Sequence, residues 1–99
     1  MCGIAGIINI DGQPVSSTVL NKMVDSIKHR GPDGNGFYTN KNIGFGHCRL
    51  SIIDLSSSGS QPMVSNNNRF VLTYNGEIYN FKELRLELEN LGHKFHSKT

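Results

Sequence analysis

The sequence predicts a small α+β domain. Residues 20–27 and 81–91 carry apolar side chains at intervals of three and four, which is the spacing of an amphipathic helix. Between and around them lie short runs of β-branched and aromatic residues bounded by Gly, Pro, Asn and Ser, as in strands joined by turns. With 99 residues and 36% hydrophobic content, the chain can form one modest hydrophobic core.

The first third of the chain predicts a strand followed by a helix. Residues 3–10 are isoleucines separated by small residues, and we expect a buried strand that ends at a turn over residues 11–12. Residues 16–28 form the helix, with Ser16 or Ser17 as its N-cap. Its apolar stripe is typical of core packing rather than of a recognition surface.

The middle of the chain predicts a hairpin. Residues 37–39 and 43–50 are expected to pair through a turn over residues 40–42. A polar loop over residues 55–62 follows, and a short strand begins at residues 63–64.

The last third predicts a strand, a helix and a further strand. Residues 69–74 are rich in β-branched and aromatic side chains, which favours a strand. Residues 80–83 resemble a capping box, so a helix is expected to start there and to close at Gly92. Residues 93–97 are expected to begin another strand.

Composition argues against several functional classes. The net charge of +2 is small and the basic residues are scattered, so the sequence offers no track for nucleic acid. No apolar run is long enough for a membrane span, and the N-terminus does not resemble a signal peptide, which predicts a cytoplasmic protein without membrane contact. Two cysteines imply no disulfide framework. His93 and His96 would point to opposite faces of a strand, so we predict no metal site.

Cys2 is the candidate nucleophile. If Met1 is removed, Cys2 carries both a thiol and a free α-amine. An α-amine has a reference pKa of about 7.7 to 8.0, so part of it is unprotonated near neutrality and can accept a thiol proton. Activation of a thiol by an adjacent base is what covalent catalysis by cysteine requires. The alternative is that Cys2 is only a small apolar residue at the head of a strand.

Two arginines have a functional and a structural interpretation each. Arg30 opens the loop Arg30–Gly31–Pro32–Asp33–Gly34, which is either a tight connecting turn or a rigid loop that holds a working residue beside a site. In that loop, Asp33 favours a local side-chain turn. Arg49 ends an apolar strand and could bind a carboxylate through its planar fork, or form an ordinary surface salt bridge.

Asn75 and Gly76 lie at a strand-to-helix junction. An Asn–Gly pair usually signals a hairpin, but the residues that follow form a helix rather than a return strand. A side-chain amide and a backbone N–H at such a junction can point together into a cleft, and two such donors can stabilise an oxyanion.

Five motifs together resemble the class II glutamine amidotransferase domain, an N-terminal nucleophile hydrolase, as it occurs in glutamine-hydrolysing asparagine synthetases. They lie in order along nearly the whole chain and are the segments 1–4, 30–34, 46–54, 61–63 and 75–80. The resemblance implies antiparallel sheets sandwiched between helices (αββα), incomplete over these residues.

The resemblance also implies a role for individual residues. Cys2 attacks the side-chain amide of L-glutamine, while Asn75 and Gly76 form the oxyanion hole. Arg49 binds the α-carboxylate and Glu77 helps to receive the α-ammonium. The backbone of the segment after Arg49 lines the substrate pocket, through Leu50, Ser51, Ile52 and Ile53.

We expect residues 1–99 to be the N-terminal part of an amidotransferase domain, with the rest of that domain and a synthetase domain absent and the fragment alone inactive or nearly so. No cofactor is expected in this segment, while ATP and Mg²⁺ are implied for the synthetase domain, which converts aspartate to asparagine. The partners are then glutamine and the rest of the chain, and an open edge at the last strand leaves a homo-oligomer possible. Two alternatives remain: an amidotransferase for another acceptor, such as a sugar, and a catalytically silent interaction or regulatory module.

Overall fold

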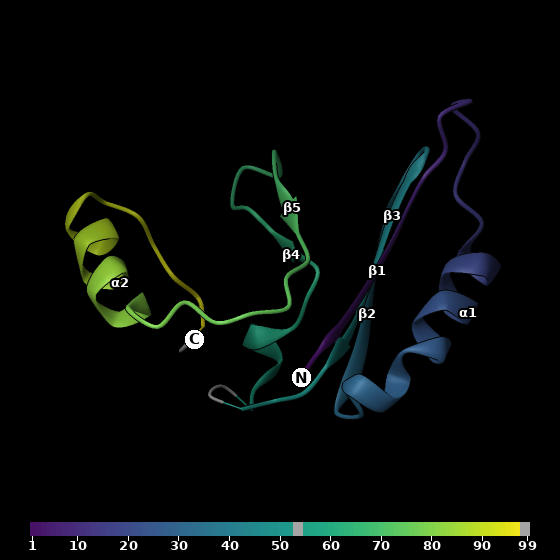
Figure 1. The fold of residues 1–99 in the computed structure, drawn as a ribbon. Coiled ribbons are helices and arrows are strands. Elements are labelled where there is room, and N and C mark those ends of the chain that lie inside the picture. Colours follow the sequence, from purple (N-terminus) through teal and green to yellow (C-terminus); the bar gives the residue numbers. More distant parts are fainter. Residues whose placement is uncertain (53–54, 98–99) are drawn as a thin grey trace.

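The computed structural model describes residues 1–52 and 55–97 (Figure 1). This part of the chain contains five strands and two α-helices in an α+β arrangement with antiparallel sheets, as predicted. The elements are β1 (Gly3–Ile8), α1 (Ser17–Ser26), β2 (Gly34–Asn40), β3 (Ile43–Arg49), β4 (Met63–Val64), β5 (Val71–Leu72) and α2 (Phe81–Asn90), with short 3₁₀ turns η1 (Lys28–Arg30) and η2 (Ser57–Gly59).

The first sheet has the strand order β1-β3-β2, and all of its pairs are antiparallel. β2 and β3 form the predicted hairpin, and Lys41 in its turn has a φ of 53°. β1 pairs along the other side of β3, with Gly3 opposite Cys48 and Ile4 opposite His47. This register decides which side chains share each face of the sheet.

Helix α1 covers one face of the first sheet. Leu20 and Val24 of the predicted apolar stripe are 1% and 0% exposed, so the stripe packs in the core as expected. The helix approaches β3 closely because Gly46 has no side chain: a Cβ there would lie 2.3 Å from Val24 Cγ2. The Ser16 side chain caps the helix by accepting a hydrogen bond from the Val19 N–H, 3.4 Å away.

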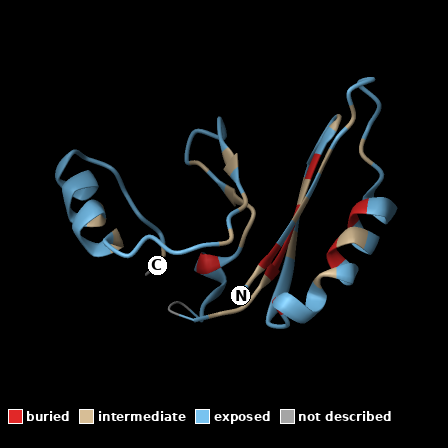
Figure 2. Cartoon of the chain, viewed as in Figure 1, coloured by how far each residue is buried: buried red, intermediate tan, exposed pale blue. Residues whose placement is uncertain are grey.

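The prediction that residues 3–10 are buried was wrong for half of the strand. Burial alternates along β1, and Ile8 on the face away from α1 is 66% exposed. Figure 2 shows buried residues on α1 and on β3 of the sheet, with a further one in η2. Successive side chains of a strand point to opposite faces, so one covering helix buries only every second residue.

The second sheet is a two-stranded pair, β4 with β5, and it is shorter than predicted. Residues 69–74 were expected to form one strand, but only Val71–Leu72 does. The chain leaves the ladder at Tyr74, whose N–H donates to Gln61 Oε1 at 2.6 Å.

Helix α2 ends as predicted, but the segment after it does not form a strand. Gly92 has a φ of 96°, and the N–H groups of Gly92 and His93 bond the carbonyls of Glu89 and Leu88, which is a Schellman closure. Residues 93–97 then run back along the helix, where the Arg85 guanidinium lies 5.0 Å from the Phe95 ring centroid.

The predicted capping box at the start of α2 is also absent. Asn80 is the N-cap, but its side chain makes no capping hydrogen bond. Among the described residues, no helix is long and apolar enough to cross a membrane.

Candidate active site

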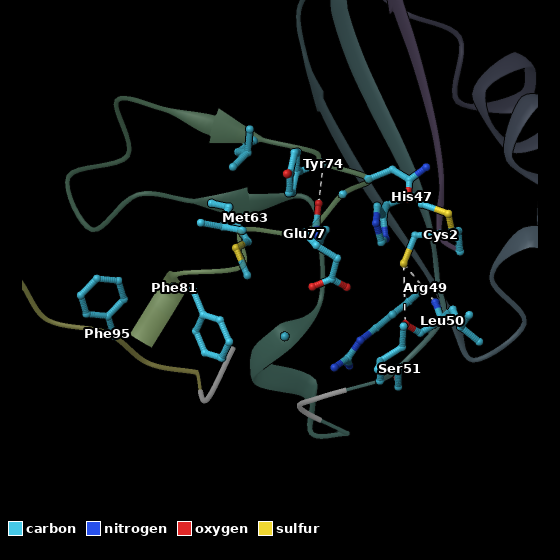
Figure 3. A pocket seen from close by; sticks show the side chains of 18 of the residues that line it. Cys2, His47, Arg49, Leu50, Ser51, Met63, Tyr74, Glu77, Phe81 and Phe95 are labelled. Carbon is cyan, nitrogen blue, oxygen red and sulfur yellow. Dashed lines mark hydrogen bonds between the residues drawn. The ribbon is translucent and has the colours of Figure 1, made fainter. Parts of the chain in front are cut away.

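A pocket of about 390 Å³ opens beside the first sheet, and its walls continue over the second sheet to α2 (Figure 3). Eight of the predicted site residues line it: Cys2, Arg49, Leu50, Ser51, Ile52, Asn75, Gly76 and Glu77. Ile53 lies outside the described residues, and Arg30 is not part of the lining. Predicted site residues as far apart in the sequence as Cys2 and Glu77 therefore line one cavity.

The thiol of Cys2 is hydrogen-bonded to the backbone of Leu50, directly after β3. Cys2 Sγ accepts a hydrogen bond from the Leu50 N–H at 3.2 Å and lies 3.7 Å from the Leu50 carbonyl oxygen, to which the thiol donates (Figure 3). Cys2 is half-buried, so the sulfur stays accessible from the pocket.

The loop over residues 30–34 supports the site from behind. Arg30 Nε donates to the Cys2 carbonyl at 3.2 Å. The Asp33 carboxylate accepts a hydrogen bond from the Ser51 N–H at 2.8 Å, so the local side-chain turn predicted for Asp33 was wrong. The loop thus holds the backbone on either side of the thiol, at Cys2 and at Ser51.

Arg49 reaches along the pocket wall to the polar loop. Its Nη1 donates to the Ser56 carbonyl, and the side chain is half-buried (Figure 3). Because Arg49 shares the pocket with Cys2, its guanidinium is a cationic group on the same cavity as the thiol.

Asn75, Gly76 and Glu77 lie on the connection from β5 to α2, as predicted. Gln61 anchors this connection through its hydrogen bond to the Tyr74 N–H. Gly76 packs against the Tyr74 ring, since a Cβ at residue 76 would lie 2.5 Å from the phenol oxygen. In Figure 3 the carboxylate of Glu77 extends toward the interior of the pocket.

His47 also lines the pocket, although it was not among the predicted site residues. It is 1% exposed, and neither ring nitrogen has a hydrogen-bond partner within the described residues. Burial lowers the pKa of His47 and the Arg49 charge lowers it further, whereas the backbone of Tyr74 acts in the opposite direction without completing a hydrogen bond. The ring is therefore neutral near pH 7. The alternation along β3 was the available signal, because Arg49 lies two residues further on the same face.

Comparison with known proteins identifies the family. The model of the glutamine amidotransferase domain matches residues 1–99. The chain belongs to this family. Asparagine synthetase [glutamine-hydrolyzing] 1 of Bacillus subtilis (strain 168) is 40% identical over 100% of this chain and 16% of its own length.

Two further relatives give the same picture. Asparagine synthetase [glutamine-hydrolyzing] 2 of Bacillus subtilis (strain 168) is 43% identical over 91% of this chain and 12% of its own length. Asparagine synthetase [glutamine-hydrolyzing] of Brassica oleracea is 43% identical over 98% of this chain and 16% of its own length. The amidotransferase chain thus spans only 12–16% of the length of these relatives.

The chemical groups around this candidate site are of several kinds. Within residues 1–52 and 55–97, no group of three or more His, Cys, Asp or Glu side chains could hold a metal ion. The cavity combines a thiol, a guanidinium, a carboxylate and a side-chain amide, from Cys2, Arg49, Glu77 and Asn75.

Proposed function

We propose that this chain hydrolyses the side-chain amide of L-glutamine with Cys2 as the nucleophile. The observation that carries the proposal is the pocket: the thiol, the Arg49 guanidinium and the Asn75–Gly76 pair line one cavity. Family membership and the printed names of the relatives support glutamine as the substrate.

The two ends of glutamine find complementary groups in the pocket. Arg49 binds the α-carboxylate, since a guanidinium presents two parallel N–H donors to a carboxylate. Glu77 carries the opposite charge and receives the α-ammonium. Asn75 and Gly76 line the same cavity and hold the amide oxygen next to the thiol.

The reaction then has two steps. Cys2 Sγ forms a bond to the amide carbon while the negative charge on the oxygen is stabilised by the Asn75 side chain and the Gly76 N–H. Removing one such donor typically costs about 2.7 to 4 kcal/mol of transition-state stabilisation. The thiol proton passes to the amide nitrogen, the C–N bond breaks and ammonia leaves. Water then hydrolyses the thioester, which releases glutamate and restores the thiol.

The base for the thiol proton is the α-amine of Cys2, which exists only after Met1 is removed. In the structure Met1 is bonded to Cys2, lines the pocket and is 67% exposed. The exposed position leaves this peptide bond accessible, and Arg30 holds the carbonyl of Cys2 in place. The second candidate, a catalytically silent module, requires Met1 to be retained, so intact-mass measurement of the native protein separates the two functions.

In the full-length protein, the ammonia serves the ATP- and Mg²⁺-dependent conversion of aspartate to asparagine by a synthetase domain. The names of the relatives and the small share of their length that the chain covers support this part of the proposal. Residues 1–99 are then the N-terminal part of a longer αββα domain in which further elements cover the open face of the first sheet. A cytoplasmic location suits a mechanism that needs free thiols, and it too is a proposal.

The test is Cys2→Ala in the full-length protein. Glutamine-dependent synthesis is expected to fall more than about 1,000-fold, because without the sulfur no thioester forms. Synthesis from added ammonia is expected to stay within about twofold, since it does not use the nucleophile. Both rates are measured as asparagine formed.

Cys48→Ala is the matched control, because Cys48 is on the α1 face of the sheet and does not line the pocket. It is expected to retain both activities. Persistence of glutamine use in Cys2→Ala would refute the assignment of Cys2.

A further inference from the structure

His47 occupies the centre of the pocket face of the first sheet. Ile4 lies directly opposite His47 in the β1–β3 ladder. Cys2 comes two residues before Ile4, and Arg49 comes two residues after His47, so all four side chains share one face. Direct and diagonal neighbours on an antiparallel pair lie about 5 to 8 Å apart. The register therefore puts the imidazole beside the thiol, whereas the guanidinium of Arg49 extends away from the ring toward the Ser56 carbonyl (Figure 3).

The imidazole is buried without a partner. His47 is 1% exposed, lines the pocket, and has both nitrogens unsatisfied within the described residues. A neutral imidazole offers one N–H donor and one acceptor nitrogen. Leaving such groups buried and unpaired is unfavourable, so a molecule in the pocket that supplies a partner gains binding free energy.

The surroundings decide which kind of group fits the acceptor nitrogen. The titratable and charged side chains around the same cavity are Cys2, Arg49, Tyr74, Glu77 and Arg85. Burial of the ring, and to a smaller extent the cation of Arg49, disfavours a positive charge at the ring. A neutral N–H donor therefore suits the site better than an ammonium group. The nitrogen of a carboxamide is such a donor.

We propose that His47 accepts a hydrogen bond from the amide nitrogen of the substrate and thereby makes the site selective for an amide. This inference rests on the proposed glutaminase function. The amide oxygen is directed to Asn75 and Gly76, so the NH₂ group lies on the remaining side of the carbonyl carbon. His47 neither takes nor gives a proton: the nitrogen keeps its N–H donors until it leaves as ammonia.

The decisive comparison is between an amide and an ester of the same acid. The γ-methyl ester of L-glutamate presents the same acyl group to Cys2, but its leaving oxygen has no hydrogen to donate. In His47→Leu and His47→Gln of the full-length protein, hydrolysis of both substrates is followed as glutamate released. We expect kcat/KM for glutamine to fall about 10- to 100-fold in His47→Leu, as for a lost buried hydrogen bond. For the ester we expect a change of less than about threefold.

Two further measurements exclude a merely structural role. The thermal midpoint of His47→Leu is expected to be unchanged or higher, because the substitution removes a buried polar side chain that has no partner. If His47→Leu does not fold, His47→Gln carries the test, since its amide oxygen can accept the same bond and should retain part of the preference for glutamine. His93→Gln is the control, because His93 is exposed, does not line the pocket, and should keep the wild-type ratio.

Equal losses on the amide and the ester would overturn the proposal, as would an unchanged rate with glutamine. Failure of the proposed function has a different signature: the wild-type protein would hydrolyse neither substrate, or Cys2→Ala would still hydrolyse both. Either result would remove the basis for the inference as well.

Discussion

Cys2 and Cys48 show how one sheet separates two chemically identical side chains. Gly3 pairs with Cys48, so Cys48 lies on the α1 face, whereas Cys2 lies on the pocket face. Cys48 is 0% exposed and its thiol donates to the Val24 carbonyl at 3.4 Å. Burial raises the pKa of the Cys48 thiol, and the Asp25 carboxylate raises it further, against a smaller opposing effect of Lys28. Access and ionisation therefore both disfavour reaction at Cys48.

Alkylation should distinguish the two thiols. With iodoacetamide at mildly alkaline pH, we expect Cys2 to be modified at least about tenfold faster than Cys48, because the thiolate is the reacting species. The rates are measured by mass spectrometry of the two cysteine peptides during a time course. In denaturant the difference should largely disappear. Faster modification of Cys48 in the native protein would contradict the burial described above.

At the scale of an element, the loop over residues 30–34 reaches the site because it packs closely against β3. Gly31 is buried against β3, and a Cβ on it would lie 2.3 Å from both the carbonyl carbon and the oxygen of Cys48. These are backbone atoms of a central strand and cannot move aside. The absence of a side chain at Gly31 thus lets the loop bring Arg30 to Cys2 and Asp33 to Ser51.

Gly31→Ala should therefore destabilise the loop and the site together. We expect a loss of about 1 to 3 kcal/mol in the free energy of unfolding, as for overpacked positions, measured by urea denaturation. Gly34→Ala in the same loop is the matched control, because no heavy atom lies within 4 Å of a Cβ there. Its effect should stay within about 0.5 kcal/mol. Equal effects of the two substitutions would show that the close approach of Gly31 is unimportant.

Local sequence signals predicted the helices and turns well, but they did not predict the contacts between distant segments. The stripe of α1, the hairpin turn and the closure at Gly92 depend on neighbouring residues, so their patterns could be recognised in the sequence. The bond from Ser51 to Asp33 and the burial of His47 depend on segments that meet only in the folded chain. Residues 93–97 illustrate the same limit, since strand-like alternation does not reveal whether a segment will find a strand or a helix as its neighbour.

For the site, too, local motifs could be predicted, whereas contacts between distant segments could not. The motif residues that carry chemistry were recognisable in order along the chain, and the described ones line one pocket. What no local pattern indicated is the bonding partner of each: the Tyr74 N–H for Gln61 and the Cys2 carbonyl for Arg30. Both contacts position residues rather than perform chemistry, and no local pattern marks such a role.

At the scale of the whole molecule, some parts of the pocket wall are more tightly packed than others. The Cys2 wall belongs to the sheet that packs on α1, whereas α2 stands apart from that sheet in Figure 1 and has no buried residue. Apolar side chains of α2, such as Leu84 and Leu88, line the pocket yet remain partly exposed. The described residues therefore hold Asn75, Gly76 and Glu77 less tightly than they hold Cys2.

Residues 1–99 alone should consequently be a poor glutaminase. In the proposed mechanism, catalysis depends on placing the oxyanion donors accurately over the thiol, and a displacement of about 1 Å can cost roughly 100-fold in rate. We expect kcat/KM of the isolated chain for glutamine to be at least about 100-fold below that of the full-length protein. Glutamate release is measured for both at equal concentrations of alkylatable Cys2, and Cys2→Ala in each background gives the uncatalysed rate. Comparable activity of the two would mean that the contacts within residues 1–99 already hold the complete site in its working geometry.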